Sequence, residues 1–181
     1  MKDILAAIRI ILLQISALIA KKEAEANTPP VTPKPVPKPE LSPREIFYKA
    51  ALDAIGSDAS PLDRAPDDLA CAETVNEIHK KAFGISIDEP GLSTIRLYHS
   101  LVALKTLFQR VSDPLPGDII ISPTGMGNGR IKHGHVGIVS EIGIMSNDSD
   151  TGLFLQKYTM ESWRLRYQIT GGFPMLFFRR V

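Results

Sequence analysis

The sequence has little cysteine and little net charge. Its 181 residues include one cysteine, so no disulfide can form within the chain and the fold must rest on its hydrophobic core. The formal net charge is +1, which provides no concentrated basic surface and excludes nucleic acid as an expected partner. There are no internal repeats. We expect one domain with an appendage, and no cofactor.

The appendage begins with an apolar segment at residues 4–20, which contains only 17 residues where a membrane-spanning helix needs about 20. Three interpretations are open: a membrane segment, a secretory signal cleaved near residues 24–26, or a helix that associates with copies of itself. The last rests on apolar residues spaced 4-3-4-3, as in a coiled coil. These are Ile4, Ile8, Ile11, Ile15 and Leu18. We therefore expect residues 1–26 to anchor or oligomerise a membrane-associated, exported or phage-borne protein.

Residues 27–41 form a proline-rich linker, with proline at nearly every second position. Proline fixes φ and removes backbone donors, so this stretch predicts an extended spacer rather than a packed element. The folded domain is expected to occupy residues 42–181.

The first half of that domain carries three helix patterns. Ser42, Pro43 and Glu45 are typical of a helix start with a capping box, and the helix should continue to Gly56. A second helix is expected over residues 67–84, with acidic residues first, lysines last and a closing glycine. Apolar spacing predicts a third helix over residues 93–108.

The second half changes to strand patterns. Strands are expected at residues 119–122, 133–140, 143–147, 153–159 and 173–180, separated by glycine-rich or polar turns. Helices followed by an antiparallel meander predict an α+β fold, with the N-terminal helices packed on a small antiparallel β-sheet.

Cys71 is the only thiol and falls in the first turn of the second expected helix. A cysteine attacks as the thiolate, and the N–H groups and dipole at a helix start stabilise that anion. The same N–H groups can bind the oxyanion that forms when a carbonyl is attacked. This position favours a nucleophile. The alternative is a cysteine that is buried as a small apolar residue.

A nucleophilic cysteine needs a base, and His135 is the best candidate. It lies in an expected strand between Gly134 and Gly137, which leave space around it. His79 is excluded because eight residues along one helix separate it from Cys71 by about 12 Å.

Two polar residues complete the expected site. Asn147 follows His135 by twelve residues on the next strand, so its amide can orient the imidazole in a Cys-His-Asn triad. His133 shares the face of His135 by strand alternation, and we expect it to contact substrate. His133, His135 and Cys71 could instead hold zinc, but a further ligand is missing, so we expect no metal.

These residues together resemble the NlpC/P60 and CHAP cysteine peptidases. The resemblance rests on a cysteine at a helix start, the turn at residues 115–119 (LPGDI), the strand at residues 135–139 (HVGIV) and a polar residue a dozen positions after the histidine. It covers about residues 42–181 and is strongest over residues 113–158. Around the cysteine this chain has LACAE at residues 69–73, where the family usually has Asp-Cys-Ser-Gly.

The resemblance implies a papain-like fold and cleavage of peptide or amide bonds in peptidoglycan. By the same resemblance, Cys71 is the nucleophile, His135 the general base and then acid, and Asn147 the orienting group. The Cys71 N–H would belong to the oxyanion hole. The substrate partner is then a peptidoglycan peptide.

Residues 161–167 contain the only tryptophan, Trp163, beside Arg164 and Arg166. This stretch is expected either to wall a groove for an acidic glycopeptide, with Trp163 contacting substrate, or to cap the small sheet with an aromatic residue.

The functional hypothesis is a peptidoglycan hydrolase, an endopeptidase or an amidase, with a cysteine nucleophile. Two alternatives remain open at this point. One is a catalytically silent structural or wall-binding module on the same fold, oligomerised through its N-terminal helix. The other is an amide-forming or amide-breaking enzyme for another substrate, such as a transacylase, because a fold does not fix the substrate.

Overall fold

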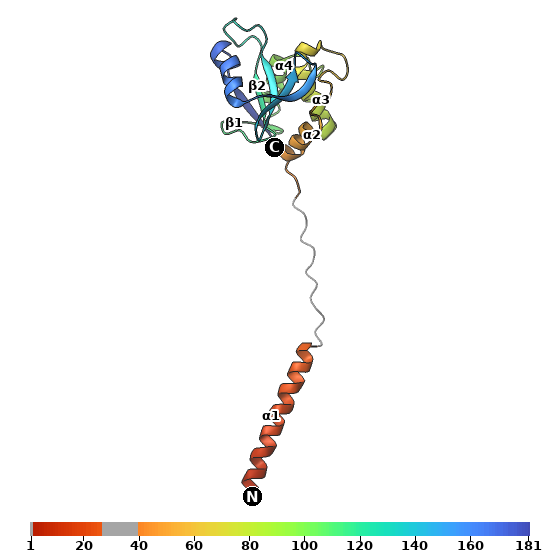
Figure 1. Ribbon diagram of the computed structural model, residues 1–181, viewed down its shortest axis with the longest axis vertical. Helices are drawn as coiled ribbons and strands as arrows, with labels where there is room; N and C mark the ends of the chain where they lie inside the picture. The colour runs from red at the N-terminus through yellow and green to blue at the C-terminus, as the bar shows by residue number, and fades with distance from the viewer. Residues whose placement is uncertain (1, 27–39) are drawn as a thin grey trace. The chain divides into compact units, whose positions relative to one another are not determined.

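The computed structural model describes residues 2–26 and 40–181, and the chain divides into two compact units, Met1–Pro39 and Glu40–Val181 (Figure 1). The expected proline-rich linker over residues 27–41 therefore lies almost wholly outside the described residues. Each unit is considered by itself below.

The first unit contains a single helix, α1 (Lys2–Ala26). Its described large apolar side chains are all exposed: Ile11, Leu12, Leu13, Ile15, Leu18 and Ile19. The side chains of Ile4 and Ile8 from the expected coiled-coil seam lie outside the described part. Among the residues that the structure describes, no helix is long and apolar enough to cross a membrane. The signal and coiled-coil interpretations stay predictions.

An antiparallel six-stranded sheet forms the centre of the second unit. Its strands are β1 (Phe108–Val111), β2 (Ile119–Ser122), β3 (His135–Ser140), β4 (Gly143–Asp148), β5 (Leu153–Tyr158) and β6 (Leu176–Arg180). Their spatial order is β1-β6-β2-β3-β4-β5, so β2 to β5 form a meander and β6 lies between β1 and β2. Together with the helices, this confirms the α+β class.

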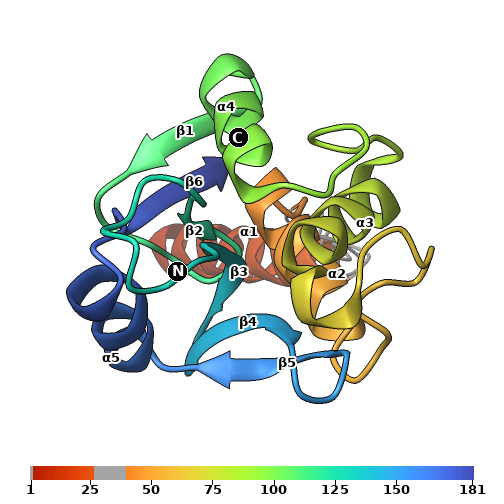
Figure 2. The same ribbon diagram turned by 90° about the horizontal axis from the view of Figure 1, so that it is seen from above.

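Helices cover both faces of this sheet. α2 (Pro43–Asp53), α3 (Cys71–Phe83) and α4 (Thr94–Ala103) come before the sheet in sequence, and a short 3₁₀ turn, η1 (Asp67–Leu69), precedes α3. α5 (Met160–Trp163) continues as a π-helix, η2 (Arg164–Thr170), between β5 and β6. Figure 2 shows α2 and α3 on one side of the sheet and α5 on the other.

Side-chain alternation along the strands divides the core into two clusters. Ile119 and Ile121 of β2 join the helix-side cluster, which contains residues of α2, α3 and α4. Ile120, between them, joins the opposite cluster with Trp163 and Tyr167. Because β2 is buried on both faces, its sequence is an apolar run rather than an alternating one.

The capping box expected at the first helix is confirmed. The Ser42 hydroxyl accepts from the Glu45 N–H at 3.4 Å, and the Glu45 carboxylate accepts from the Ser42 N–H at 2.8 Å. Pro43 is the first helical residue, where its missing N–H costs nothing. Gly84 closes α3 with a positive φ of 76°, as expected for a glycine at that position.

The turn before β2 is held by a buried carboxylate. Asp118 is fully buried, accepts from the Leu115 N–H at 2.7 Å and pairs with Arg179 of β6 at 2.7 Å. Gly117 has a φ of 94°, and a Cβ there would lie 2.6 Å from the Arg44 carbonyl oxygen. The Gly-Asp pair of the turn therefore joins α2, β2 and β6.

Two expected elements were wrong. The third helix ends at Ala103 instead of residue 108, and Phe108 begins β1, where it is paired with Arg180 of β6. The helical spacing of Phe108 reflects burial in the same core, which its side chain enters from a strand. The second helix is also divided, because residues 67–69 form a 3₁₀ turn and Cys71 is the first residue of α3.

Candidate active site

Cys71 lies where α3 begins and where the helix meets the sheet. Its side chain belongs to the helix-side core and is 6% exposed. The backbone N–H groups of Val136, Ala72 and Cys71 itself lie around the sulfur and favour its anionic form. α3 packs on β3 and β4, which fixes the sulfur against the first residues of β3.

The loop before α3 is bound to the helix by a buried carboxylate. Glu73 is fully buried and accepts from the Ser60 hydroxyl at 2.8 Å and the Ala65 N–H at 3.1 Å. Arg64 lies 3.5 Å from the other Glu73 oxygen and 2.6 Å from Glu77. These contacts hold residues 60–65 against the first two turns of α3 and so fix the segment that leads to Cys71.

His135 is the first residue of β3, and its ring lies on the opposite face of the sheet from α3. It stacks on Tyr167 with ring centroids 5.4 Å apart and planes 10° apart, and it also contacts Trp163 (5.4 Å) and Tyr158 (5.7 Å). The residue is 8% exposed. The aromatic side chains of β5, α5 and η2 thus form a rigid surround for the imidazole.

One ring nitrogen of His135 has a defined partner. Nε2 lies 3.2 Å from the Ser146 hydroxyl, which donates to the Asn147 carbonyl oxygen at 3.4 Å. We assign the hydroxyl as donor to the carbonyl and as acceptor from Nε2–H, the tautomer that uses both contacts. This assignment leaves Nδ1 as the basic nitrogen of a neutral imidazole.

The two glycines beside His135 are required by close approaches of backbone. A Cβ at Gly134 would lie 2.0 Å from the Ser122 carbonyl oxygen, and one at Gly137 would lie 2.7 Å from the Met145 carbonyl oxygen. The expectation that they make room for the histidine is therefore incomplete: they allow the neighbouring strands to approach β3.

A partial separation of β3 from β4 creates the space for the sulfur. Cα pairing between these strands covers only Ile138 to Ser140 of β3, although both strands are six residues long. Val136 lies nearer the start of β3, and its N–H faces the Cys71 sulfur instead of β4. The start of α3 thus occupies the position that further ladder bonds would fill.

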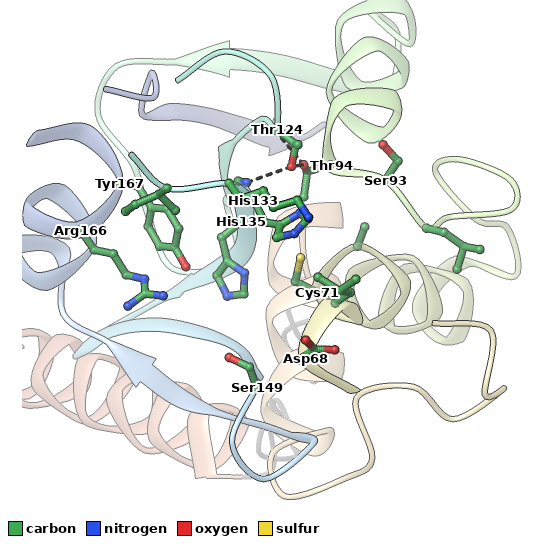
Figure 3. A pocket seen from close by; sticks show the side chains of 16 residues that line it. Asp68, Cys71, Ser93, Thr94, Thr124, His133, His135, Ser149, Arg166 and Tyr167 are labelled. Carbon is green, nitrogen blue, oxygen red and sulfur yellow. Dashed lines mark hydrogen bonds between the residues drawn. The ribbon is translucent and has the colours of Figure 1, made fainter. Parts of the chain in front are cut away.

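Cys71 and His135 line the same pocket, of about 370 Å³ (Figure 3). In Figure 3 the His135 ring lies between the Cys71 sulfur and Tyr167. The pocket is also lined by Asp68, Leu69, Ala72, Leu92, Ser93, Thr94, Thr124, Ile131, Lys132, His133, Gly134, Ser149 and Arg166. No hydrogen bond joins the thiol to the imidazole among the described residues, which is common before substrate binds.

A hydroxyl network fixes one wall of the pocket. The Thr94 hydroxyl lies 2.9 Å from the Thr124 hydroxyl and accepts from the Thr124 N–H at 3.0 Å. The Gly134 N–H donates to the Thr124 hydroxyl at 2.9 Å. The start of α4, the loop after β2 and the start of β3 are therefore joined directly beside His135.

The thiol is neutral at ordinary pH. Burial raises the pKa of Cys71 to about 11, against the lowering effect of the three N–H groups around the sulfur. The helix start alone therefore does not produce a thiolate here.

The imidazole is neutral as well. The pKa of His135 is lowered to about 3, mainly by burial and also by the positive charges of Arg166 and Lys157. The Asn147 carbonyl acts in the opposite direction. The resting site therefore holds a thiol and a neutral imidazole, the protonation states from which general-base catalysis starts.

The expected site residues differ in where they lie. Cys71, His133 and His135 line one pocket, with His133 exposed. Strand alternation places the Asn147 side chain with Met145 on the helix-side face, opposite His135, because Ile138 and Met145 are paired. The contacts with the imidazole come from the Ser146 hydroxyl and the Asn147 main chain, which corrects the expected orienting group.

The expected contact of Trp163 with substrate is also corrected. Trp163 is fully buried and donates from Nε1 to the Ser122 hydroxyl at 3.2 Å, so it cannot wall an open groove. It packs behind His135 instead, which agrees with the alternative of an aromatic that caps the sheet. Arg166, from the same stretch, does line the pocket.

Among the described residues, no three His, Cys, Asp or Glu side chains converge as a metal site. Sequence reasoning missed Ser146 and Tyr167 as neighbours of the imidazole. The signal for Ser146 was present, since it shares the face of His135 once β3 and β4 are paired around their turn. Tyr167 gave no local signal because η2 brings it to the pocket from across the sheet.

No family model matches the chain, and a search of curated proteins finds no relative.

Proposed function

We propose that the protein is a cysteine-dependent hydrolase that cleaves a peptide or amide bond, with Cys71 as nucleophile and His135 as base. The observation that carries this proposal is the convergence of the only thiol, at a helix start, and a strand histidine on one pocket. The hydrogen bond of Nε2 to Ser146 supports it, because it leaves Nδ1 unprotonated.

In the first step of this mechanism, Nδ1 of His135 takes the thiol proton as the Cys71 sulfur bonds to the carbonyl carbon. The carbonyl π electrons move to oxygen, and the resulting oxyanion accepts hydrogen bonds from the N–H groups around the sulfur. The imidazolium then protonates the departing amine, which leaves a thioester. Water, deprotonated by the same nitrogen, hydrolyses this thioester and restores the thiol.

Because both groups are neutral at rest, proton transfer and sulfur attack must occur together rather than from a preformed thiolate–imidazolium pair. Peptidoglycan is the substrate we propose, on the basis of the NlpC/P60 and CHAP resemblance of the residue 115–119 turn and the residue 135–139 strand. The papain-like form of the fold is part of the same proposal.

The test uses the full chain and a Cys71→Ala variant with purified peptidoglycan of several stem-peptide chemistries. Mass spectrometry of the released material identifies the bond from its new termini. Fragments from the wild type alone would support the proposal and separate endopeptidase from amidase. With both proteins folded, an absence of fragments from every wall type would refute the wall-hydrolase assignment.

A second candidate is a catalytically silent module. The observation in its favour is that Cys71 is nearly fully buried, with a raised pKa, as expected of a structural cysteine. This candidate predicts that the wild type and Cys71→Ala bind wall fragments equally in a pull-down and release nothing.

A further inference from the structure

The pocket that contains Cys71 carries an excess of positive charge. Its lining includes two basic side chains, Lys132 and Arg166, against one carboxylate, Asp68. The chain as a whole is almost neutral, so this local excess does not follow from composition.

Neither cation is neutralised within the described structure. Most arginines of this domain form ion pairs with carboxylates, as Arg164 does with Glu161 at 2.9 Å. No described carboxylate lies within ion-pair distance of Arg166 or Lys132. Asp150, whose charge contributes to raising the pKa of Arg166, is itself paired with Lys157 at 3.6 Å.

The Arg166 guanidinium is exposed and lies beside an aromatic ring. Its Cζ lies 5.6 Å from the centroid of the Tyr167 ring, and Tyr167 stacks on His135. Figure 3 shows Arg166 on the Tyr167 side of the pocket, across His135 from Cys71. The planar guanidinium presents paired donors that suit a planar carboxylate.

We propose that this pocket selects a substrate with a free carboxylate near the bond that is attacked, and that Arg166 is the residue that binds this carboxylate. The inference rests on the proposed function, because it takes Cys71 as the attacking atom. It extends that function by naming the charge of the substrate and the residue that determines it.

The experiment compares two alkylating reagents of nearly equal size, the anion iodoacetate and the neutral iodoacetamide. Each forms an S–C bond to Cys71, with iodide leaving and the thiol proton passing to solvent. The ratio of their second-order rate constants reports pocket charge alone, because both reagents draw on the same thiolate fraction. Rates are measured at pH 9 on the full chain, with the urea-unfolded chain as the reference.

Relative to the unfolded chain, folded wild type should favour iodoacetate. Arg166→Gln should lower the ratio on the order of fivefold, since a partly exposed pair of charges contributes about that much. Arg166→Lys should restore part of it, and added salt should weaken it. Arg164→Gln is the matched control, because it removes the same charge two residues away and outside the pocket. Equal ratios in Arg166→Gln and Arg164→Gln would overturn the proposal.

If folded Cys71 reacts with neither reagent, the nucleophile assignment fails, and carboxylate selection is decided separately. Nuclear magnetic resonance of the Arg166 Nε–H signal in Cys71→Ala then compares N-acetylaspartate with N-acetylasparagine. A saturable shift with the anion alone supports carboxylate binding, and identical responses to the two probes refute it.

Discussion

The pH dependence of Cys71 alkylation tests the neutral resting state directly. With its pKa raised from 9.0 to about 11, Cys71 should have about a hundredfold less thiolate at pH 8 than an ordinary thiol. A more basic thiolate is also more nucleophilic, by about tenfold for two pKa units at a Brønsted slope near 0.45. The folded protein should therefore react with iodoacetamide about tenfold more slowly than its unfolded chain, before any further loss from burial.

The assay follows iodoacetamide incorporation by mass spectrometry from pH 6 to pH 10.5, with circular dichroism to verify that the protein stays folded. The rate should rise about tenfold per pH unit across this range without a plateau. Cys71→Ser provides the blank. The ultraviolet absorbance of the thiolate gives an independent titration.

A plateau below pH 8, with folded protein reacting faster than the unfolded chain at pH 6, would refute this reasoning. It would mean that Cys71 and His135 form a thiolate–imidazolium pair, so that the attraction between the two charges exceeds the cost of burying them. His135→Gln would then remove the plateau.

Two further predictions concern stability. His135 has its pKa lowered from 6.5 to about 3, so the unfolded chain binds a proton that the folded one does not, and the free energy of unfolding should fall as pH falls below 6.5. Between pH 7 and pH 5, the free energy of unfolding in urea should fall by about 2 kcal/mol more for the wild type than for His135→Gln. The control variant His99→Gln should match the wild type. Equal losses in all three proteins would contradict the burial of a neutral imidazole. Gly134→Ala should destabilise by about 3 kcal/mol, since its Cβ would lie 2.0 Å from the Ser122 carbonyl oxygen. The control Gly125→Ala lies in open space with a φ of 88° and should lower the free energy of unfolding by only about 1 kcal/mol. A Gly134→Ala protein with wild-type thermal stability would contradict the close approach of Gly134 to Ser122.

Local chemistry accounts for the elements that the sequence predicted well. The capping box at Ser42 and the glycine at the end of α3 act within one turn of chain, so their residues specify the boundary without help from the rest of the fold. The strand positions after residue 118 could also be predicted from the sequence, because turns and apolar runs alternate there.

Elements that depend on partners far along the chain could not be predicted from the sequence. β1 is a strand because β6 supplies hydrogen bonds from about 70 residues further along, and nothing in residues 104–111 indicates that partner. Similarly, residues 161–167 around Trp163 contain three charged residues within seven, which suggested an exposed wall. The burial of Trp163 follows from the position of α5 over the far face of the sheet, which is a tertiary feature.

The candidate site itself shows why its two principal residues were predictable and its orienting group was not. Cys71 belongs to the helix-side core and His135 to the opposite face, and a sheet keeps its two faces apart along most of a strand. Such residues can share a pocket only where the strand begins, and His135 is the first residue of β3. Spacing along the sequence selects the neighbouring strand but not the face, and the face decides between Ser146 and Asn147. The pairing of Ile138 with Met145 assigns the His135 face to Ser146.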